Sequence, residues 1–408
     1  MGCRTPVGAF TNSSPLARAV GFWGLAASIV NITIGGSIFA LPGTLYASLG
    51  PAAPLAYILG ALLFAPIVLC FAAVGSRFTT TGGPYRYVEA AFGRAAGLVV
   101  ALLFWISNIA GSAGMAAILA TQAAYAVPVL AAPLPRAAFL AVTYAILYSL
   151  NARGVKLGAR AIMVFAAAKV IPLLVLATAG LAFVQLDNLR IAAAPDVHSL
   201  GSALVIAIFA YSGIETALAP SGELRDPAKV VPGAALVGVT IVVVLYVGLQ
   251  IAAQGILGPA LAGNEAPLSA IAEVIMPGSG WLVVATATLS LFGVLLGELL
   301  GSSRLLFALA QDGILPATLA VVSPQYRVPT RAIFAHAFAA WLMSAAGTFN
   351  KLAMISGGAF CVVYIGCCAA AWRLQRTGAT QTAEPLRLPG GALIPAVGIT
   401  CLVLVLLT

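Results

Sequence analysis

The sequence predicts an all-α polytopic membrane protein, and three observations lead to this fold class. Hydrophobic residues make up 62% of the 408 residues and charged residues only 8%, whereas a soluble domain carries roughly 25% charged residues. The apolar residues occur in runs of about 20 or more, the length that crosses a bilayer core as a helix. These runs are too long for transmembrane strands, which span with about 9–11 residues. The composition therefore excludes a soluble enzyme, a secreted disulfide scaffold and a nucleic-acid-binding domain.

Eleven apolar runs are long enough to span a membrane. They cover residues 20–49, 51–75, 95–127, 134–151, 158–184, 199–220, 231–257, 279–311, 329–348, 351–373 and 390–407. Connections at one side of these spans hold sixteen Lys and Arg residues, and those at the other side hold three. Because cytoplasmic loops are enriched in Lys and Arg, we expect a cytoplasmic N-terminus. The alanine- and leucine-rich, lysine-poor composition favours a bacterial inner (plasma) membrane.

Two spans contain residues that interrupt a helix. The first has Gly35-Gly36 followed by Pro42, and the sixth has Gly213 and Glu215 at mid-membrane depth. Glycine costs about 1 kcal/mol in a helix interior, and proline removes a backbone hydrogen bond. Each break opens a run of five spans, which indicates a five-plus-five inverted repeat with paired broken helices around a binding site. For either span alone, close helix packing through small residues is the alternative.

Three ionisable residues stand out inside the predicted spans, where a charge costs about 2.5–3.5 kcal/mol and calls for a partner or a task. Lys169, near the middle of the fifth span, is either a proton carrier or a fixed countercharge for Glu215 or for backbone carbonyls. Glu215 is a candidate for protonation near neutrality or a structural hydrogen-bond acceptor. Glu298, in the eighth span, can face a cationic substrate group, pair with Lys169 or form a polar contact between helices.

With these residues identified, the chain resembles the amino acid–polyamine–organocation (APC) family of secondary transporters over residues 20–373. Four segments carry the resemblance, each at the span where the family has its motif. They are Gly35-Gly36-Ser37-Ile38-Phe39-Ala40-Leu41-Pro42; Gly82-Gly83-Pro84-Tyr85-Arg86-Tyr87-Val88-Glu89 with Phe92-Gly93; Phe209 to Glu215 with Gly222-Glu223-Leu224-Arg225-Asp226-Pro227 and Pro232; and Ser303-Arg304 with Ala310-Gln311-Asp312-Gly313-Ile314-Leu315-Pro316.

The resemblance implies the five-plus-five LeuT-like fold and a set of site residues. It implies that the two breaks bind the amino and carboxylate groups of an amino acid through Ile34, Gly35, Gly36, Ser37 and Ile38 and through Phe209, Ala210, Tyr211, Ser212 and Gly213. Lys169 matches a lysine that replaces a sodium ion in proton-coupled members. Glu215 matches an acid implicated in the proton dependence of antiporters, and Glu298 falls where some members place a substrate-side aromatic residue.

The predicted spans and the resemblance together give the expected organisation of the chain. We expect a cytoplasmic N-terminal segment (1–19), a transporter core (20–373) and a cytoplasmic loop with a last span (374–408). Within the core, repeat one covers about 20–184 and repeat two about 199–373. Two departures from the family stand out. Ser37 replaces a glycine of the first break, and eleven spans are counted where many members have twelve.

These observations predict a secondary active transporter that moves amino acids by alternating access as a proton symporter. An amino acid/amine exchanger with Glu215 as pH sensor is the alternative, and a non-transporting membrane sensor is a further one. We expect Phe209 and Tyr211 to contact an apolar part of the substrate. Glu298 favours a cationic or polar substrate, whereas Gly111, Ser112, Ala113 and Gly114 favour a medium-sized neutral one, and we expect neutral or broad specificity.

Motifs for other kinds of chemistry do not occur in the sequence. It has no phosphate-binding glycine loop with Lys-Ser or Lys-Thr, no Cys/His cluster with metal-ligand spacing and no nucleophile elbow. We therefore expect no enzymatic activity, cofactor, metal site or nucleic-acid partner. The expected partners are an amino acid, protons and the lipid bilayer.

Overall fold

A computed structural model describes residues 16, 18–39, 41–191, 194–264, 266–346 and 349–407. Regular structure in these residues is helical, and one isolated β-bridge joins Val20 to Leu224. The α-helices are α1 (Phe22–Thr33), α2 (Leu41–Leu49), α3 (Ala53–Gly75), α4 (Pro84–Phe92), α5 (Arg94–Ala126), α6 (Pro133–Ala152), α7 (Val155–Gly180), α8 (Val197–Ala210), α9 (Ile214–Ala217), α10 (Pro227–Leu257), α11 (Pro267–Ile275), α12 (Gly280–Gln311), α13 (Thr330–Ala346), α14 (Phe349–Thr377) and α15 (Leu393–Leu407). Short 3-10 turns cover Ser37–Phe39, Gly50–Ala52, Pro128–Ala131, Leu181–Phe183, Leu186–Leu189, Ser221–Glu223, Gly258–Leu261 and Ala317–Ala320.

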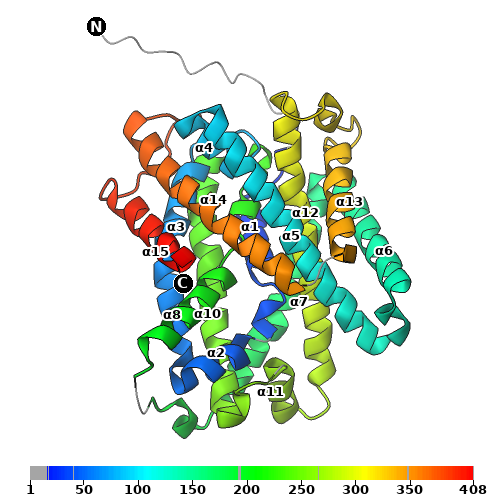
Figure 1. The fold of residues 1–408 in the computed structure, drawn as a ribbon, viewed down its shortest axis with the longest axis vertical. Helices are drawn as coiled ribbons and strands as arrows, with labels where there is room; N and C mark the ends of the chain where they lie inside the picture. Colours follow the sequence, from blue (N-terminus) through cyan, green and yellow to red (C-terminus); the bar gives the residue numbers. More distant parts are fainter. Residues whose placement is uncertain are drawn as a thin grey trace.

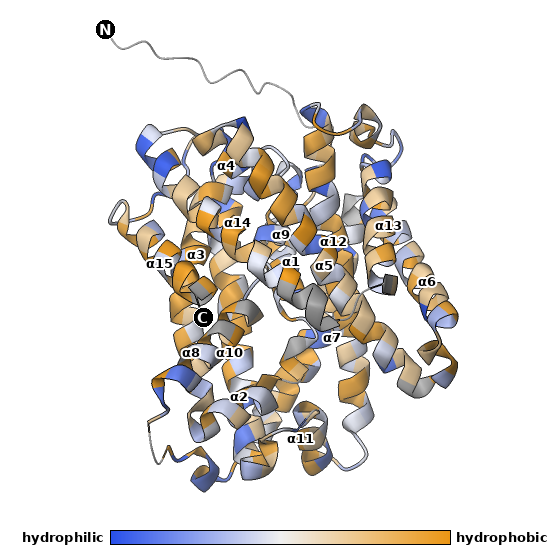
Figure 2. Cartoon of the chain, viewed as in Figure 1, coloured by the Kyte–Doolittle hydropathy of each residue, from blue (hydrophilic) through white to orange (hydrophobic). Residues whose placement is uncertain are grey.

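The helices form a bundle with an apolar belt. In the described residues, 7 helical stretches are long and apolar enough to cross a membrane, and Phe22–Thr33, Val197–Ile208 and Leu393–Leu404 are shorter apolar helices. Figure 2 shows the hydrophilic residues gathered at the two ends of the bundle, with orange helices between them. Each of the eleven predicted spans coincides with a helix or a pair of helices. The chain is therefore an integral membrane protein, as its composition predicts.

The first predicted break is confirmed. Helix α1 ends at Thr33, a 3-10 turn follows at Ser37–Phe39, and α2 begins at Leu41. The interruption falls on the Gly35-Gly36 pair, where the helix has its weakest backbone preference.

The sixth span is also broken as predicted, between the end of α8 and the start of α9. Gly213 precedes α9 with φ of 135°, a value that side chains other than glycine rarely tolerate. A Cβ at this position would lie 2.9 Å from Thr33 Oγ1. Glycine is therefore required here both by the backbone angle and by the close approach of the two breaks.

The pairs of spans that contact each other recur when five is added to or subtracted from each span number. The first span contacts the seventh (α1 with α10), and the sixth contacts the second (α8 with α3). Likewise α5 packs on α14, and α12 packs on α7. Helices α6 and α13, the fourth and ninth spans, pair with each other at one side of the bundle, while α15 lies on the opposite side against α3 and α14 (Figure 1). This pattern is what two five-helix repeats produce; their boundaries at 20–184 and 199–373 stay a prediction.

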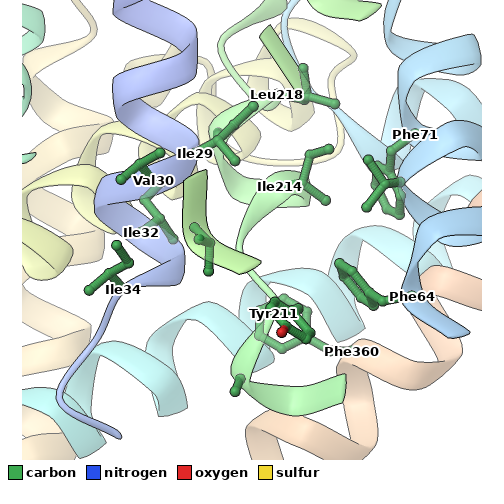
Figure 3. Close-up of a cluster of buried hydrophobic side chains, with 14 of the residues drawn as sticks. Ile29, Val30, Ile32, Ile34, Phe64, Phe71, Tyr211, Ile214, Leu218 and Phe360 are labelled. Carbon is green, nitrogen blue, oxygen red and sulfur yellow. The ribbon is translucent and has the colours of Figure 1, made fainter. Parts of the chain in front are cut away.

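Apolar packing holds the two broken helices together. Figure 3 shows Ile214 and Leu218 lying between the isoleucine-rich face of α1 and the rings of Phe64 and Phe71 on α3. Ile214 and Leu218 are fully buried. Since α9 has only four helical residues, this packing positions the segment rather than its own hydrogen bonds.

Candidate functional site

A small cavity lies where the two broken helices meet. Its volume is about 50 Å³, enough for a few water molecules. A whole amino acid therefore fits only after the surrounding helices move apart. The cavity is lined by Ile32, Thr33, Gly35, Gly111, Met115, Ala210, Ser212, Gly213, Glu215, Val294, Glu298, Ser356 and Phe360.

The predicted substrate residues divide between the cavity wall and the core. Gly35, Ala210, Ser212 and Gly213 line the cavity. Ile34 and Ile38 are fully buried, and Gly36 faces the side chain of Leu291. The side chains of Ser37 and Phe209 lie outside the described part of the structure, as does the whole of Ala40 from the first motif.

Tyr211 does not line the cavity, although we expected it to contact substrate. Its ring stacks on Tyr246 of α10, with centroids 5.6 Å apart and planes at 26°. Its hydroxyl donates to the carbonyl oxygen of Tyr57 at 3.0 Å. Tyr211 thus fixes the end of α8 against α3 and α10 through core packing.

Lys169 projects from α7 to the end of α1. Its Nζ donates to the carbonyl oxygens of Asn31 at 2.9 Å, Ile34 at 2.8 Å and Ser290 at 3.2 Å. The side chain is fully buried. An ammonium group has three protons to donate, and these three carbonyls match them. Of the alternatives open from the sequence, the contact with backbone carbonyls is the one present.

Two further side chains bind carbonyls at the ends of the broken helices, and neither was predicted from the sequence. Ser290 Oγ donates to the carbonyl oxygen of Ile34 at 2.9 Å. The hydroxyl of Tyr246 lies 3.0 Å from the carbonyl oxygen of Thr33 and 3.3 Å from that of Ala210. Tyr246 therefore bridges the end of α1 and the end of α8.

Glu215 lines the cavity while its carboxylate is held by the protein. Oε2 accepts a hydrogen bond from the backbone N–H of Gly213 at 3.0 Å and one from the Tyr364 hydroxyl at 2.7 Å. Tyr364 lies on α14, so this carboxylate ties the sixth break to the tenth span. The arrangement matches the structural role left open for Glu215 and also joins an ionisable group to the break.

Glu298 reaches the same cavity from α12. Its Oε2 accepts a hydrogen bond from the Ser112 hydroxyl on α5, and the residue is 8% exposed. Among the described residues, none of the ion pairs includes Glu298 or Lys169. Because Lys169 donates its protons to carbonyls, it is not the partner of Glu298, and that alternative is wrong.

The motif residues outside the cavity meet at one end of the bundle. Arg86 on α4 lies 3.0 Å from Glu89 and 2.7 Å from Asp312. The hydroxyl of Tyr85 donates to Asp312 at 2.6 Å. Burial raises the pKa of Tyr85, and the hydrogen bond to Asp312 acts in the same direction. The network fixes α4 to the end of α12.

A second ion pair of the motif residues is fully buried. Arg304 Nε lies 2.7 Å from Glu223 Oε1, and both side chains have 0% exposure. The backbone carbonyl of Glu223 also accepts hydrogen bonds from the N–H groups of Ala19 and Val20. The loop after the sixth span is thus joined to α12 and to the segment before α1.

Other parts of the described structure do not compete as a site. A larger cavity of about 530 Å³ lies between α6 and α13, and its lining is aromatic and alanine-rich without a charged side chain. No group of three or more His, Cys, Asp or Glu in the described residues could hold a metal ion. Glu215 and Glu298 line the cavity at the two breaks, and Lys169 contacts the end of α1 beside it.

A membrane bundle with two interrupted helices around a polar cavity is the architecture of secondary transport proteins. The sequence pattern of the family described as amino acid permease matches residues 20–408. The chain therefore belongs to the amino acid permease family.

Several known proteins are similar to this chain. An uncharacterized transporter of Mycobacterium tuberculosis is 30% identical over 301 residues, covering 71% of this chain and 66% of the relative. The large neutral amino acids transporter small subunit 2 of Oryctolagus cuniculus is 27% identical, covering 78% of this chain and 62% of the relative. The methylthioribose transporter of Bacillus subtilis is 25% identical, covering 79% and 73%. The chain thus spans about two thirds of the length of these relatives.

Proposed function

We propose that this protein is a secondary active transporter that moves amino acids across a membrane by alternating access, coupled to protons. Membership of the amino acid permease family supports the substrate class. The named relatives include a transporter of amino acids and a transporter of methylthioribose. Because these substrates differ, the substrate of this chain is inferred from its own residues. The cation distribution supports a cytoplasmic N-terminus, and the composition supports a bacterial inner membrane.

One observation carries the proton coupling: the Lys169 amine joins the end of α1 to α7 and α12. When protonated, it offers three donors to three carbonyl oxygens. Loss of one proton leaves two donors and a lone pair that faces a carbonyl oxygen. A buried carbonyl without its donor is costly, so deprotonation favours release of α1 from its neighbours.

This dependence gives a coupling mechanism. Protonated Lys169 keeps the end of α1 docked beside the cavity, and deprotonated Lys169 lets it move. Substrate bound at the breaks has different contacts in the two arrangements and therefore shifts their populations. Proton and substrate therefore act on the same helix, which couples the binding of one to the binding of the other.

The test is uptake of a labelled amino acid mixture into empty proteoliposomes under an inward proton gradient without sodium. We expect accumulation by the wild type and a loss of about 10-fold or more for Lys169→Ala, because α1 loses its charged anchor. The matched control is Lys229→Ala, since Lys229 is 83% exposed and lies in a surface pair with Asp226. Gel filtration of each purified variant checks its folding. Full accumulation by Lys169→Ala would contradict the proposed role.

Exchange is the second candidate, and the contact of Glu215 with the Gly213 N–H favours it. Protonation of this carboxylate would weaken an acceptor at the sixth break and so make the break sensitive to pH. Wild-type protein that takes up label only when the vesicles are preloaded with amino acids or amines would establish exchange and move the coupling from Lys169 to Glu215.

A further inference from the structure

The charge of the cavity wall is one-sided. Glu215 and Glu298 are its ionisable residues among those that the structure describes, and this described lining contains no Lys, Arg or His. Lys169 lies nearby, but its protons point to the carbonyls of α1 and α12. An ionised carboxylate at membrane depth is stabilised by a compensating charge, and none of the ion pairs among the described residues includes Glu298.

Glu298 is built into the wall so that one oxygen stays available. Ser112 donates to Oε2, which fixes the orientation of the carboxylate. A Cβ placed on Gly111 would lie 3.5 Å from Oε1, so a larger side chain at this position would cover that oxygen. Glycine at 111 therefore leaves Oε1 facing the cavity, next to the donor that holds Oε2.

Apolar side chains also line the cavity, together with the hydroxyl residues Thr33, Ser212 and Ser356. Val294 lies one helical turn before Glu298 on the same face of α12, and Met115 and Phe360 line the cavity from α5 and α14. An aliphatic chain that ends in a positive charge complements such a wall, because its methylene groups contact the apolar residues and its charged end reaches the carboxylate.

We propose that Glu298 binds the cationic side-chain end of the substrate, so that the site selects basic amino acids such as L-lysine over neutral ones of the same shape. This inference rests on the proposed transport of amino acids, whose main-chain groups are assigned to the two breaks. It replaces the neutral or broad specificity expected from the sequence. Glu298 is thus a specificity-determining residue of the proposed site.

The experiment compares two ligands that differ in one group. L-Lysine and L-norleucine have the same four-carbon side chain, and lysine carries the additional ammonium group. Binding of each is measured on the purified full chain in detergent, by displacement of labelled amino acid and by thermal shift. We expect the wild type to prefer lysine by about 10-fold or more, because a site built around a polar partner rejects the analogue that lacks it.

The variants then assign that preference. Glu298→Gln keeps the shape and removes the charge, and we expect the lysine-to-norleucine ratio to fall to about 1–3. The matched control is Asp187→Asn, which also removes a carboxylate charge but lies in an exposed surface pair with Arg190 outside the cavity lining; its ratio should stay at the wild-type value. If Glu298→Gln does not fold, Glu298→Asp and the wild-type ratio decide the question.

Three outcomes overturn the inference. A wild-type ratio of one or below would exclude a cation-selective site. An unchanged ratio in folded Glu298→Gln would assign the preference elsewhere. If Glu298→Gln loses the pH dependence of uptake but keeps the lysine-to-norleucine ratio, Glu298 is a proton carrier instead. In each case binding of neutral amino acids would leave the proposed function intact, whereas failure of all twenty amino acids to bind would contradict that function itself.

Discussion

Two carboxylates line the same cavity, yet the protein treats them differently. Glu215 accepts hydrogen bonds from Gly213 and Tyr364 on one oxygen, and these bonds join the sixth break to α14. Glu298 accepts one from Ser112, and its other oxygen faces the cavity beside Gly111. Two donors of the chain tie Glu215 to the sixth break and to α14, whereas one donor holds Glu298, whose other oxygen lies beside Gly111.

This difference separates a structural acid from a recognition acid. A buried group whose partners are all internal stabilises the fold, and removing it leaves those partners without an acceptor. A carboxylate with an open oxygen contributes less to the stability of the fold, and that oxygen can interact with a ligand. Replacing Glu215 should therefore change mainly the stability of the protein, whereas replacing Glu298 should change mainly its substrate specificity.

Replacing Glu215 with alanine should give the largest loss of stability. The N–H of Gly213 and the hydroxyl of Tyr364 would both lose a charged acceptor in a buried setting. Each unsatisfied group costs about 1–3 kcal/mol, so we expect a loss of roughly 3 kcal/mol or more. Thermal unfolding of the purified protein in detergent measures it as a fall in Tm.

Glu215→Gln separates the hydrogen bonds from the charge. Its amide oxygen can still accept from one donor, so the fall in Tm should be about half that of Glu215→Ala. Equal Tm values for wild type and Glu215→Ala would mean that Glu215 is not the anchor of the sixth break, and the contrast with Glu298 would disappear.

The next effect should come from the donor, in Tyr364→Phe. The ring remains and keeps its stacking on Phe360, whose centroid lies 5.9 Å away. Only the hydrogen bond to Glu215 is lost, and a bond to a charged group is worth about 1.5–3 kcal/mol. We expect a smaller fall in Tm than for Glu215→Ala.

The double variant decides whether Tyr364 acts through Glu215. If it does, Glu215→Ala with Tyr364→Phe should cost less than the sum of the two single changes, because both remove the same bond. Additive losses would show that the two residues stabilise the protein independently.

The breaks and the intramembrane charges could be predicted because their signals are local. Gly35-Gly36 and Gly213 disfavour helix wherever they occur, and Lys169 within an apolar run demands a partner. The helices α4 and α11 were not predicted, although Pro84 and Pro267 stand at their first positions, where proline favours a helix start. Their surroundings are short connections in which no long periodic pattern develops.

The partners of those charges could not be predicted. Lys169 contacts residues 121 to 138 positions away in the chain, and Tyr364 lies 149 positions from Glu215. Helix packing sets such pairs, and uniformly apolar spans give little indication of which face meets which neighbour. Tyr211 illustrates the difficulty: its position in the break was visible, but its direction toward α3 and α10 was not.

The smallest effect should follow Ser112→Ala, which tests the open side of the comparison. This change removes the donor to Glu298 Oε2 and leaves the carboxylate in place. Because the Glu298 side chain lines the cavity and water can replace the lost donor, we expect a loss of about 1 kcal/mol or less. The preference for L-lysine over L-norleucine should persist, somewhat reduced, since Ser112 orients the carboxylate and Glu298 supplies the charge. A Tm fall as large as that of Glu215→Ala, measured by the same unfolding assay, would instead make Glu298 a second structural acid, held by Ser112 as firmly as Glu215 is held by Tyr364.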